Sequence, residues 1–252
     1  MLVSIVIPTY NRLPILRKCL DALENQIVTD QIDYEIVIVD DGSTDGTVDW
    51  LKSNFRTFPH LRLFEQSHCG AAQGRNLGVD KANGDVIVFI DSDLVVDKFF
   101  LANHFKSLTK AWIKLGNRKC FTYGSVINTS NFNAPNTEPF KLQDLSWAYF
   151  ATGNVAIDKK VLEKSGLFDT SFQLYGWEDL ELGERLRNMG VKLIKCPKAI
   201  GYHWHPALSL NQIPDLIRIE KERAKMGLVF YRKHPTLRVK FIIQYTYIHR
   251  CL

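Results

Sequence analysis

Short apolar runs alternate with helical patterns through the first half of the chain. Runs rich in β-branched residues occupy residues 2–7, 35–39, 61–64 and 86–90. Helical spacing or helix start and stop signals mark residues 16–27, 44–54 and 70–82 between them. Near-continuous apolar strands are typical of a sheet covered on both faces. The alternation of strand and helix predicts parallel βαβ units.

The second half has a less regular pattern. We expect helices at residues 99–115, 158–164, 178–189 and 213–231, and strands at residues 120–127, 154–157 and 191–195. Residues 128–138 are rich in Asn, Thr and Pro, which favours a mobile loop. The predicted fold class is therefore α/β, with a mostly parallel sheet sandwiched by helices.

Polar clusters follow three of the early strands. They are Pro8-Thr9-Tyr10-Asn11, Asp40-Asp41-Gly42-Ser43 and Asp91-Ser92-Asp93. Ligands of open parallel sheets bind beyond the carboxyl ends of the strands, and all three clusters occupy that edge. The sequence therefore predicts one binding site built from three loops.

The Asp91-Ser92-Asp93 triplet carries the most chemical information. Two carboxylates at positions i and i+2 of an extended chain point the same way. Mg²⁺ and Mn²⁺ are typically held by one or two carboxylates together with substrate phosphates. The alternative is an ordinary turn, since Asp and Ser satisfy backbone groups there. Its position at the predicted edge favours a cation that carries a diphosphate.

Composition is that of an ordinary globular protein. The 252 residues are 46% hydrophobic and 23% charged, and the five cysteines are scattered with no C-x-x-C pair. A disulfide framework or a structural zinc site therefore has little support. We find no signal-peptide pattern and no apolar stretch of about 20 residues. A reducing, cytoplasmic location is the simplest expectation.

The net charge of +5 is unevenly distributed. Residues 212–252 contain nine Lys and Arg and three Asp and Glu, which gives +6, so the remainder sums to −1. We interpret this segment as a basic, amphipathic helical appendage. Such a face is usually only solvated, and the sharper hypothesis is peripheral docking on the anionic inner face of a membrane. A nucleic-acid partner is the less favoured interpretation.

The ordered motifs resemble family 2 glycosyltransferases of the GT-A fold. The similarity covers roughly residues 2–206 and rests on residues 4–11, 35–45, 74–78, 91–93, 153–154, 176–179 and 203–205. It implies a Rossmann-like GT-A domain at residues 1–211. Residues 1–115 would form its nucleotide-sugar half and residues 116–211 its acceptor half. Residues 212–252 lie outside the shared pattern.

The resemblance also assigns a nucleotide-sugar site. It implies contacts with the nucleotide sugar from Pro8, Thr9, Tyr10, Arg12, Asp40, Arg75, Asp91 and Ser92. The Asp40 carboxylate can only accept hydrogen bonds, which suits the imide N–H of uracil. The Arg75 guanidinium would reach the diphosphate or the rim of the base. The alternatives are a turn and helix cap for the Asp40-Asp41 pair and a surface arginine for Arg75.

A divalent cation, Mn²⁺ or Mg²⁺, would be held by Asp93, by Asp91 and by His203, with His205 as the second candidate. The imidazole ligand favours Mn²⁺. In similar enzymes the residue matching Asp179 removes the proton of the acceptor, and Glu178 would contact the acceptor or orient the site. Both residues begin a helix, whose dipole favours the ionised carboxylate and lowers its basicity. Burial or a neighbouring carboxylate would have to offset that effect.

Three further residues are expected at the acceptor site: Trp177, Gly153 and Asn154. Trp177 would stack on a sugar, or it is an ordinary core aromatic. The resemblance implies an inverting transferase that moves a sugar from a UDP-sugar to a hydroxyl of a polysaccharide, glycolipid or glycan. The alternatives are a retaining transferase, a nucleotidyltransferase and a non-catalytic nucleotide-sugar-binding protein.

Overall fold

An eight-stranded sheet forms the centre of the protein, with strand order β3-β2-β1-β4-β7-β6-β8-β5. The computed structural model describes residues 1–144, 148–207 and 209–246. The strands are β1 (Leu2–Thr9), β2 (Asp33–Asp40), β3 (Leu61–Glu65), β4 (Val86–Ile90), β5 (Leu94–Val96), β6 (Cys120–Thr129), β7 (Asn154–Asp158) and β8 (Lys192–Trp204). The helices are α1 (Leu13–Glu24), α2 (Thr47–Ser53), α3 (Ala71–Lys81), α4 (Phe100–Leu115), α5 (Lys159–Lys164), α6 (Glu178–Asn188), α7 (Ile213–Lys233) and α8 (Leu237–Ile242).

The sheet is mostly parallel, as predicted. Strand β1 pairs in parallel with β2 and β4, β2 pairs in parallel with β3, and β6 pairs in parallel with β8. Strand β7 joins the two parts through antiparallel pairing with both β4 and β6. The first three parallel pairings leave the carboxyl ends of β1, β2 and β4 at one edge.

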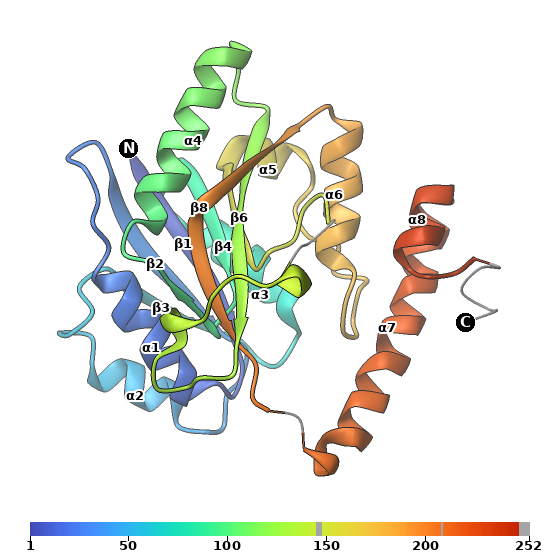
Figure 1. The fold of residues 1–252 in the computed structure, drawn as a ribbon, viewed down its shortest axis with the longest axis horizontal. Helices are drawn as coiled ribbons and strands as arrows, with labels where there is room; N and C mark the ends of the chain where they lie inside the picture. Colours follow the sequence, from blue (N-terminus) through green and yellow to red (C-terminus); the bar gives the residue numbers. More distant parts are fainter. Residues whose placement is uncertain (145–147, 208, 247–252) are drawn as a thin grey trace.

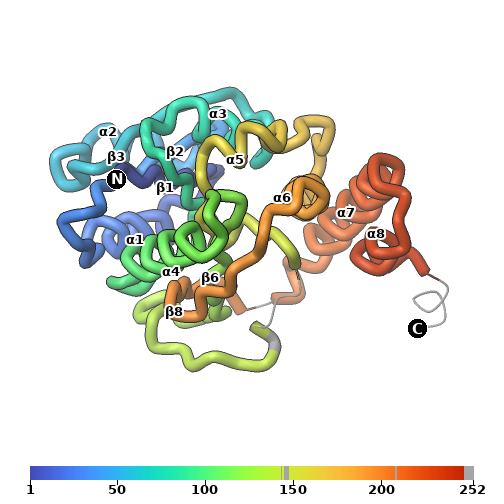
Figure 2. The backbone as a smooth tube through the Cα atoms, turned by 90° about the horizontal axis from the view of Figure 1, so that it is seen from above, coloured from blue at the N-terminus to red at the C-terminus, as the bar shows by residue number. Residues whose placement is uncertain are grey.

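Helices cover both faces of the sheet, which explains the continuous apolar strands. Figure 2 shows α1 and α4 on one side and α3, α5 and α6 on the other. A separate hydrophobic core lies on each face of the sheet. In β1, Ile5 and Ile7 belong to one core and Val6 to the other. Successive side chains of a strand point to opposite faces, so each residue needs an apolar partner on its own side.

Strand β8 is much longer than the predicted strand at residues 191–195. It continues to Trp204, and the unpredicted short strand β5 pairs with its end. Pro197 and Gly201 interrupt the apolar pattern there. A register shift between Gly124 and Ser125 of β6 accommodates the irregularity. The predicted loop at 128–138 likewise begins later, because β6 runs to Thr129.

The C-terminal helices α7 and α8 pack beside α6 (Figure 1). Phe172, Met226, Phe230 and Val239 form a small separate core between them and the body. The predicted helix at 213–231 is confirmed, and α8 is an addition. Residues 247–252 of the predicted appendage lie outside the described residues. Among the residues described, no helix combines the length and apolar character needed to cross a bilayer.

Candidate active site

The three predicted polar clusters meet at one edge of the sheet. The loops after β1 and β2 are joined by hydrogen bonds from the Asn11 N–H to Ser43 Oγ (2.9 Å) and from the Thr44 N–H to Asn11 Oδ1 (2.8 Å). The Asp91–Asp93 loop follows β4, the other neighbour of β1. The prediction that these three loops share one edge of the sheet is therefore confirmed.

Asp91, Asp93 and His203 form a group suited to a cation. One carboxylate oxygen from each aspartate and one ring nitrogen of His203 all lie within 4.8 Å of one another. Strand β5 brings them together, since Leu94 lies opposite His203 in β8. The His205 ring packs against that of His203, with centroids 4.2 Å apart, and lies outside the group. Two carboxylates and an imidazole are a ligand set that fits Mn²⁺.

The two members with the closest contact already stabilise charge on each other. His203 Nε2 lies 2.9 Å from Asp93 Oδ1, and Arg12 Nη1 lies 3.3 Å from Asp93 Oδ2. Burial is the largest single effect and opposes charge on both side chains, but the hydrogen bond between them and the neighbouring charges together outweigh it. The pKa of Asp93 is consequently lowered and that of His203 is raised.

Arg75 lies inside the site and not on the surface. Its Nη2 contacts Asp91 Oδ1 at 3.1 Å and its Nη1 contacts Glu178 Oε1 at 2.9 Å. The interpretation of Arg75 as a surface arginine is therefore wrong. A single guanidinium joins the predicted cation site to the predicted catalytic pair.

Asp40 and Asp41 have different environments. Asp41 accepts hydrogen bonds from Gln66 Nε2 (2.7 Å) and from the backbone N–H groups of Cys69 (2.8 Å) and Gly70 (2.9 Å), so it holds the loop before α3. Asp40 accepts two backbone N–H groups on Oδ1, whereas its buried Oδ2 has no partner. The hydroxyl of Thr9 is also buried without a partner. Buried polar atoms are rarely left unpaired, so these two oxygens mark a place for hydrogen-bond donors.

Tyr10 is an exposed aromatic residue at this edge. It is 43% exposed, and its ring stacks on His68 with centroids 4.2 Å apart. Pro8 lies under Gly74, where an added Cβ would approach Pro8 Cβ to 3.2 Å. Ser92 is buried, and its carbonyl accepts a hydrogen bond from Cys19 Sγ. Whether these residues contact a nucleotide sugar stays a prediction.

Glu178 and Asp179 begin α6, directly after Trp177 in the left-handed region (φ 77°). Asp179 accepts the backbone N–H of Leu180 at 2.7 Å and that of Thr152 at 3.4 Å. Burial of the carboxylate and the adjacent charge of Glu178 raise the pKa of Asp179 to about 7, against the opposing effect of Arg75. Burial and a neighbouring acid thus offset the helix dipole, as the sequence argument required.

The predicted acceptor residues have separate roles in the structure. An added Cβ on Gly153 would lie 3.3 Å from Asp91 Oδ2, so this glycine lies against the cation site. Asn154 is fully buried. Its Oδ1 is hydrogen-bonded to His104 Nε2, and its Nδ2 donates to the carbonyls of Ser125 and Ala199. Its side chain therefore stabilises the interior below the site. We correct the expectation that it faces an acceptor.

Trp177 is turned toward the C-terminal helices. Its Nε1 donates to the Arg223 carbonyl at 2.7 Å, and the Arg223 guanidinium lies 5.0 Å from the ring centroid. Phe230 packs on the same ring. Of the two interpretations given for Trp177, packing is the one the geometry favours.

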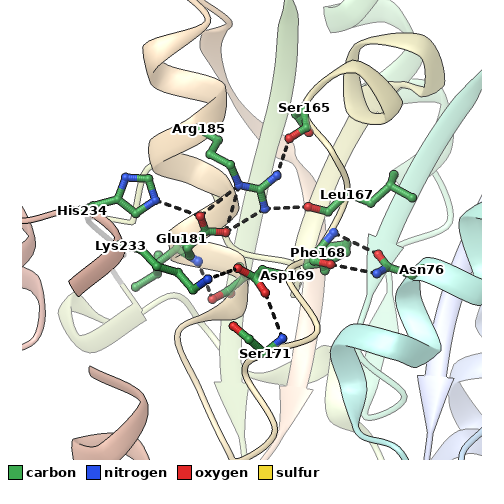
Figure 3. A network of polar contacts seen from close by, with 12 residues as sticks. Asn76, Ser165, Leu167, Phe168, Asp169, Ser171, Glu181, Arg185, Lys233 and His234 are labelled. Carbon is green, nitrogen blue, oxygen red and sulfur yellow. Dashed lines mark hydrogen bonds and ion pairs between the residues drawn. The ribbon is translucent and has the colours of Figure 1, made fainter. Parts of the chain in front are cut away.

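Sequence reasoning missed a polar network that joins α6 to the segment after α5 and to His234 after α7 (Figure 3). Glu181 is 2% exposed and accepts Arg185 Nη2 at 2.7 Å and His234 Nε2 at 2.8 Å. Arg185 also donates to the carbonyls of Ser165 and Leu167. The i, i+4 spacing of Glu181 and Arg185 is a signal readable in the sequence. No local pattern indicates His234.

Glu184, one turn further along α6, repeats this arrangement. It is buried and accepts Arg187 Nη2 at 2.9 Å from its own helix and Arg238 Nε at 2.6 Å from α8. Lys233 adds an ion pair to Asp169 at 2.7 Å. The basic residues of the C-terminal segment are thus partly used to hold α7 and α8 against the helix that begins with Glu178 and Asp179.

Comparison with known proteins agrees with this architecture. The chain is 26% identical to an uncharacterised glycosyltransferase, YfnE, of Bacillus subtilis (strain 168), over 86% of this chain and 68% of that protein. It is 30% identical to the chondroitin synthase of Escherichia coli, over 83% of this chain. The chain spans only 35% of that synthase.

A solved structure of similar fold is the mannosyltransferase PcManGT from Pyrobaculum calidifontis, in complex with GDP-Man and Mn²⁺. Its TM-score is 0.65 and its identity 23%, over 96% of this chain and 68% of that one. At this identity the likeness shows the fold alone. The family described as Glycosyl transferase family 2 matches residues 4–166 of the sequence. Together with the GT-A architecture, this match shows that the chain belongs to glycosyltransferase family 2.

Proposed function

We propose that this protein is a metal-dependent, inverting glycosyltransferase. It would transfer a sugar from a nucleoside diphosphate sugar, with UDP as the nucleotide, to a hydroxyl group of a polysaccharide, glycolipid or glycan. The observation that carries the proposal is the bridge made by Arg75, because its guanidinium contacts both Asp91 and Glu178. A cation ligand and the catalytic pair are therefore separated by one side chain, as transfer from a diphosphate to an acceptor requires.

The proposed reaction assigns one role to each part of the site. Asp179 takes the proton of the acceptor hydroxyl, whose oxygen attacks the anomeric carbon from the face opposite the diphosphate. The bond from that carbon to the diphosphate oxygen breaks, so the configuration inverts. A pKa of about 7 suits this base near neutral pH. A cation held by Asp91, Asp93 and His203 would offset the negative charge of the leaving diphosphate.

The preference for uracil rests on the two unpaired oxygens near β1 and β2. Asp40 Oδ2 and Thr9 Oγ1 are buried acceptors at the strand ends, and the Tyr10 ring is exposed beside them. Uracil offers an imide N–H to a carboxylate and a flat face to an aromatic ring. Similar structures have been solved with different nucleotides, TarS of S. aureus with UDP and PcManGT with GDP-Man.

A thermal-shift panel tests the nucleotide and the metal together. We expect UDP to raise the melting temperature more than GDP, and we expect this effect to require Mn²⁺ or Mg²⁺, because a ligand of the folded state stabilises by mass action. A larger shift with GDP would contradict the uracil assignment. With a donor identified, NMR of the product anomer separates inversion from retention. Release of pyrophosphate would identify a nucleotidyltransferase, and binding without turnover would identify a non-catalytic protein.

Contact with an anionic membrane is a second part of the proposal. Seven exposed residues of α7 mix apolar and basic side chains: Ile213, Leu216, Ile217, Lys221, Lys225, Leu228 and Arg232. Truncation before α7 would remove His234 and Arg238, one partner each of the buried Glu181 and Glu184. Charge reversal is therefore the better test. Replacement of Lys221, Lys225 and Arg232 by glutamate should abolish co-sedimentation with phosphatidylserine vesicles, and unchanged binding would exclude this face.

A further inference from the structure

Arg75 occupies a position that a cation and a diphosphate would both affect. It lies in α3, and its side chain is 7% exposed, compared with 46% for Arg12. Both arginines contact a carboxylate of the cation group, Arg75 at Asp91 and Arg12 at Asp93. Water surrounds the Arg12 guanidinium, whereas the Arg75 guanidinium is almost fully enclosed and its contact is the shorter, 3.1 Å against 3.3 Å. The charge of Arg75 is therefore the less screened of the two.

The guanidinium is fixed from its other side. The Phe168 ring centroid lies 5.6 Å from Arg75 Cζ. Asn76, the next residue of α3, holds the Phe168 backbone through two hydrogen bonds of 2.8 and 2.9 Å. Arg75 Nε is buried and has no partner. The arginine therefore keeps hydrogen-bonding capacity while its two terminal nitrogens contact Asp91 and Glu178.

Two positive charges would compete for one carboxylate in this arrangement. A cation held by Asp91, Asp93 and His203 needs an oxygen of Asp91, and Oδ1 of that residue already contacts Arg75. The Arg75 charge thus opposes a free cation at this position. An entering diphosphate supplies new acceptors for the guanidinium, since arginine binds phosphate oxygens strongly.

We propose that Arg75 couples cation binding to diphosphate binding. Before the nucleotide sugar arrives, Arg75 neutralises Asp91 and keeps its affinity for a free cation low. The diphosphate then shares the guanidinium, which releases Asp91 to the cation. This inference rests on the proposed function in that the donor is a nucleoside diphosphate sugar. Coupling of this kind is reciprocal, so Mn²⁺ and UDP would raise each other's affinity by the same factor.

Electron paramagnetic resonance of free Mn²⁺ tests the coupling without any turnover. The dissociation constant of Mn²⁺ is measured with and without UDP for the unmodified protein and for Arg75→Gln. We expect Arg75→Gln to bind Mn²⁺ about tenfold more tightly without UDP, and the enhancement by UDP to fall by about the same factor. Arg118→Gln is the matched control, because Arg118 pairs with Asp158, an aspartate outside the site. It should change neither constant.

Arg75→Lys supplies a second variant should the glutamine variant fail to fold. A lysine keeps the charge but cannot contact two carboxylates as a fork, so we expect a smaller change in the same direction. Unchanged or weaker Mn²⁺ binding without UDP, with undiminished enhancement by UDP, would overturn the coupling role alone. Failure of the unmodified protein to bind either UDP or Mn²⁺ would overturn the donor assignment and this inference with it.

Discussion

Acidic residues of the loops that follow β1, β2 and β4, here called the strand-end loops, and acidic residues of helix α6 are held by different kinds of partner. In the strand-end loops, Asp40 and Asp41 accept backbone N–H groups from residues nearby in the same or the next loop. On α6, Glu181 and Glu184 are buried and each accepts one arginine of its own helix and one basic residue of the C-terminal segment. The first arrangement needs only the sheet, whereas the second needs α7 and α8.

This difference separates the two tasks of the site. The proposed nucleotide-sugar side is supported by loops that the parallel strands bring together. The proposed catalytic pair, Glu178 and Asp179, is supported by helix α6, which is held in turn by the partners of Glu181 and Glu184. A substitution on one side should therefore leave the function of the other side measurable.

Asp179→Asn should give the largest effect. The amide keeps the shape of the side chain but cannot take a proton, so we expect turnover to fall by roughly 10²–10⁴-fold. Binding of UDP with Mn²⁺, measured by thermal shift, should persist because the strand-end loops are untouched. Undiminished turnover would remove Asp179 as the base.

Glu181→Gln tests whether α6 depends on its buried ion pairs. The change leaves Arg185 and His234 without their carboxylate, and breaking a buried pair typically costs about 3–5 kcal/mol. At about 2–4 °C per kcal/mol, the melting temperature should fall by several degrees or more. Glu65→Gln, which loses an exposed pair with Lys52, is the control and should cost less than about 1 kcal/mol. Equal losses would refute the comparison.

Two substitutions should separate the stability of the strand-end loops from UDP binding: Asp41→Asn and Asp40→Asn. Asp41 accepts hydrogen bonds on both oxygens, and an amide keeps only one acceptor, so we expect a loss of about 1–3 kcal/mol of stability. Asp40 has one oxygen free, so Asp40→Asn should leave stability almost unchanged and weaken UDP binding by about tenfold or more. Chemical denaturation and calorimetry measure the two effects, and a reversed pattern would contradict the assignment.

The pH dependence of turnover tests the environment of Asp179 at the start of α6. The proposed base, Asp179, must be ionised to accept a proton, and its pKa is about 7. The rate should therefore rise tenfold per pH unit below about pH 7 and level off above it. Glu178→Gln removes the neighbouring charge that raises this pKa, so the rising limb should move to lower pH. A limb that stays in place would exclude Glu178 as the cause.

The convergence of the loops on the proposed nucleotide-sugar side could be predicted because it depends on local sequence patterns. Apolar periodicity marks β1, β2 and β4, and parallel strands bring their carboxyl ends to one edge whatever the details of packing. The positions of His203 and Arg75 were less accessible. His203 reaches Asp93 only because β8 continues past Pro197 to pair with β5, and no periodic signal extends that far.

The sequence by itself determined the α/β layering and the convergence of three polar loops, since both follow from side-chain periodicity and strand direction. Tertiary structure decided which charged groups meet: Arg75 with Asp91 and Glu178, and Glu181 with His234 at a separation of 53 residues. The physical reason is that apolar patterning acts through burial, which any apolar partner satisfies. A buried charge requires one partner at one distance, and only the folded chain supplies it.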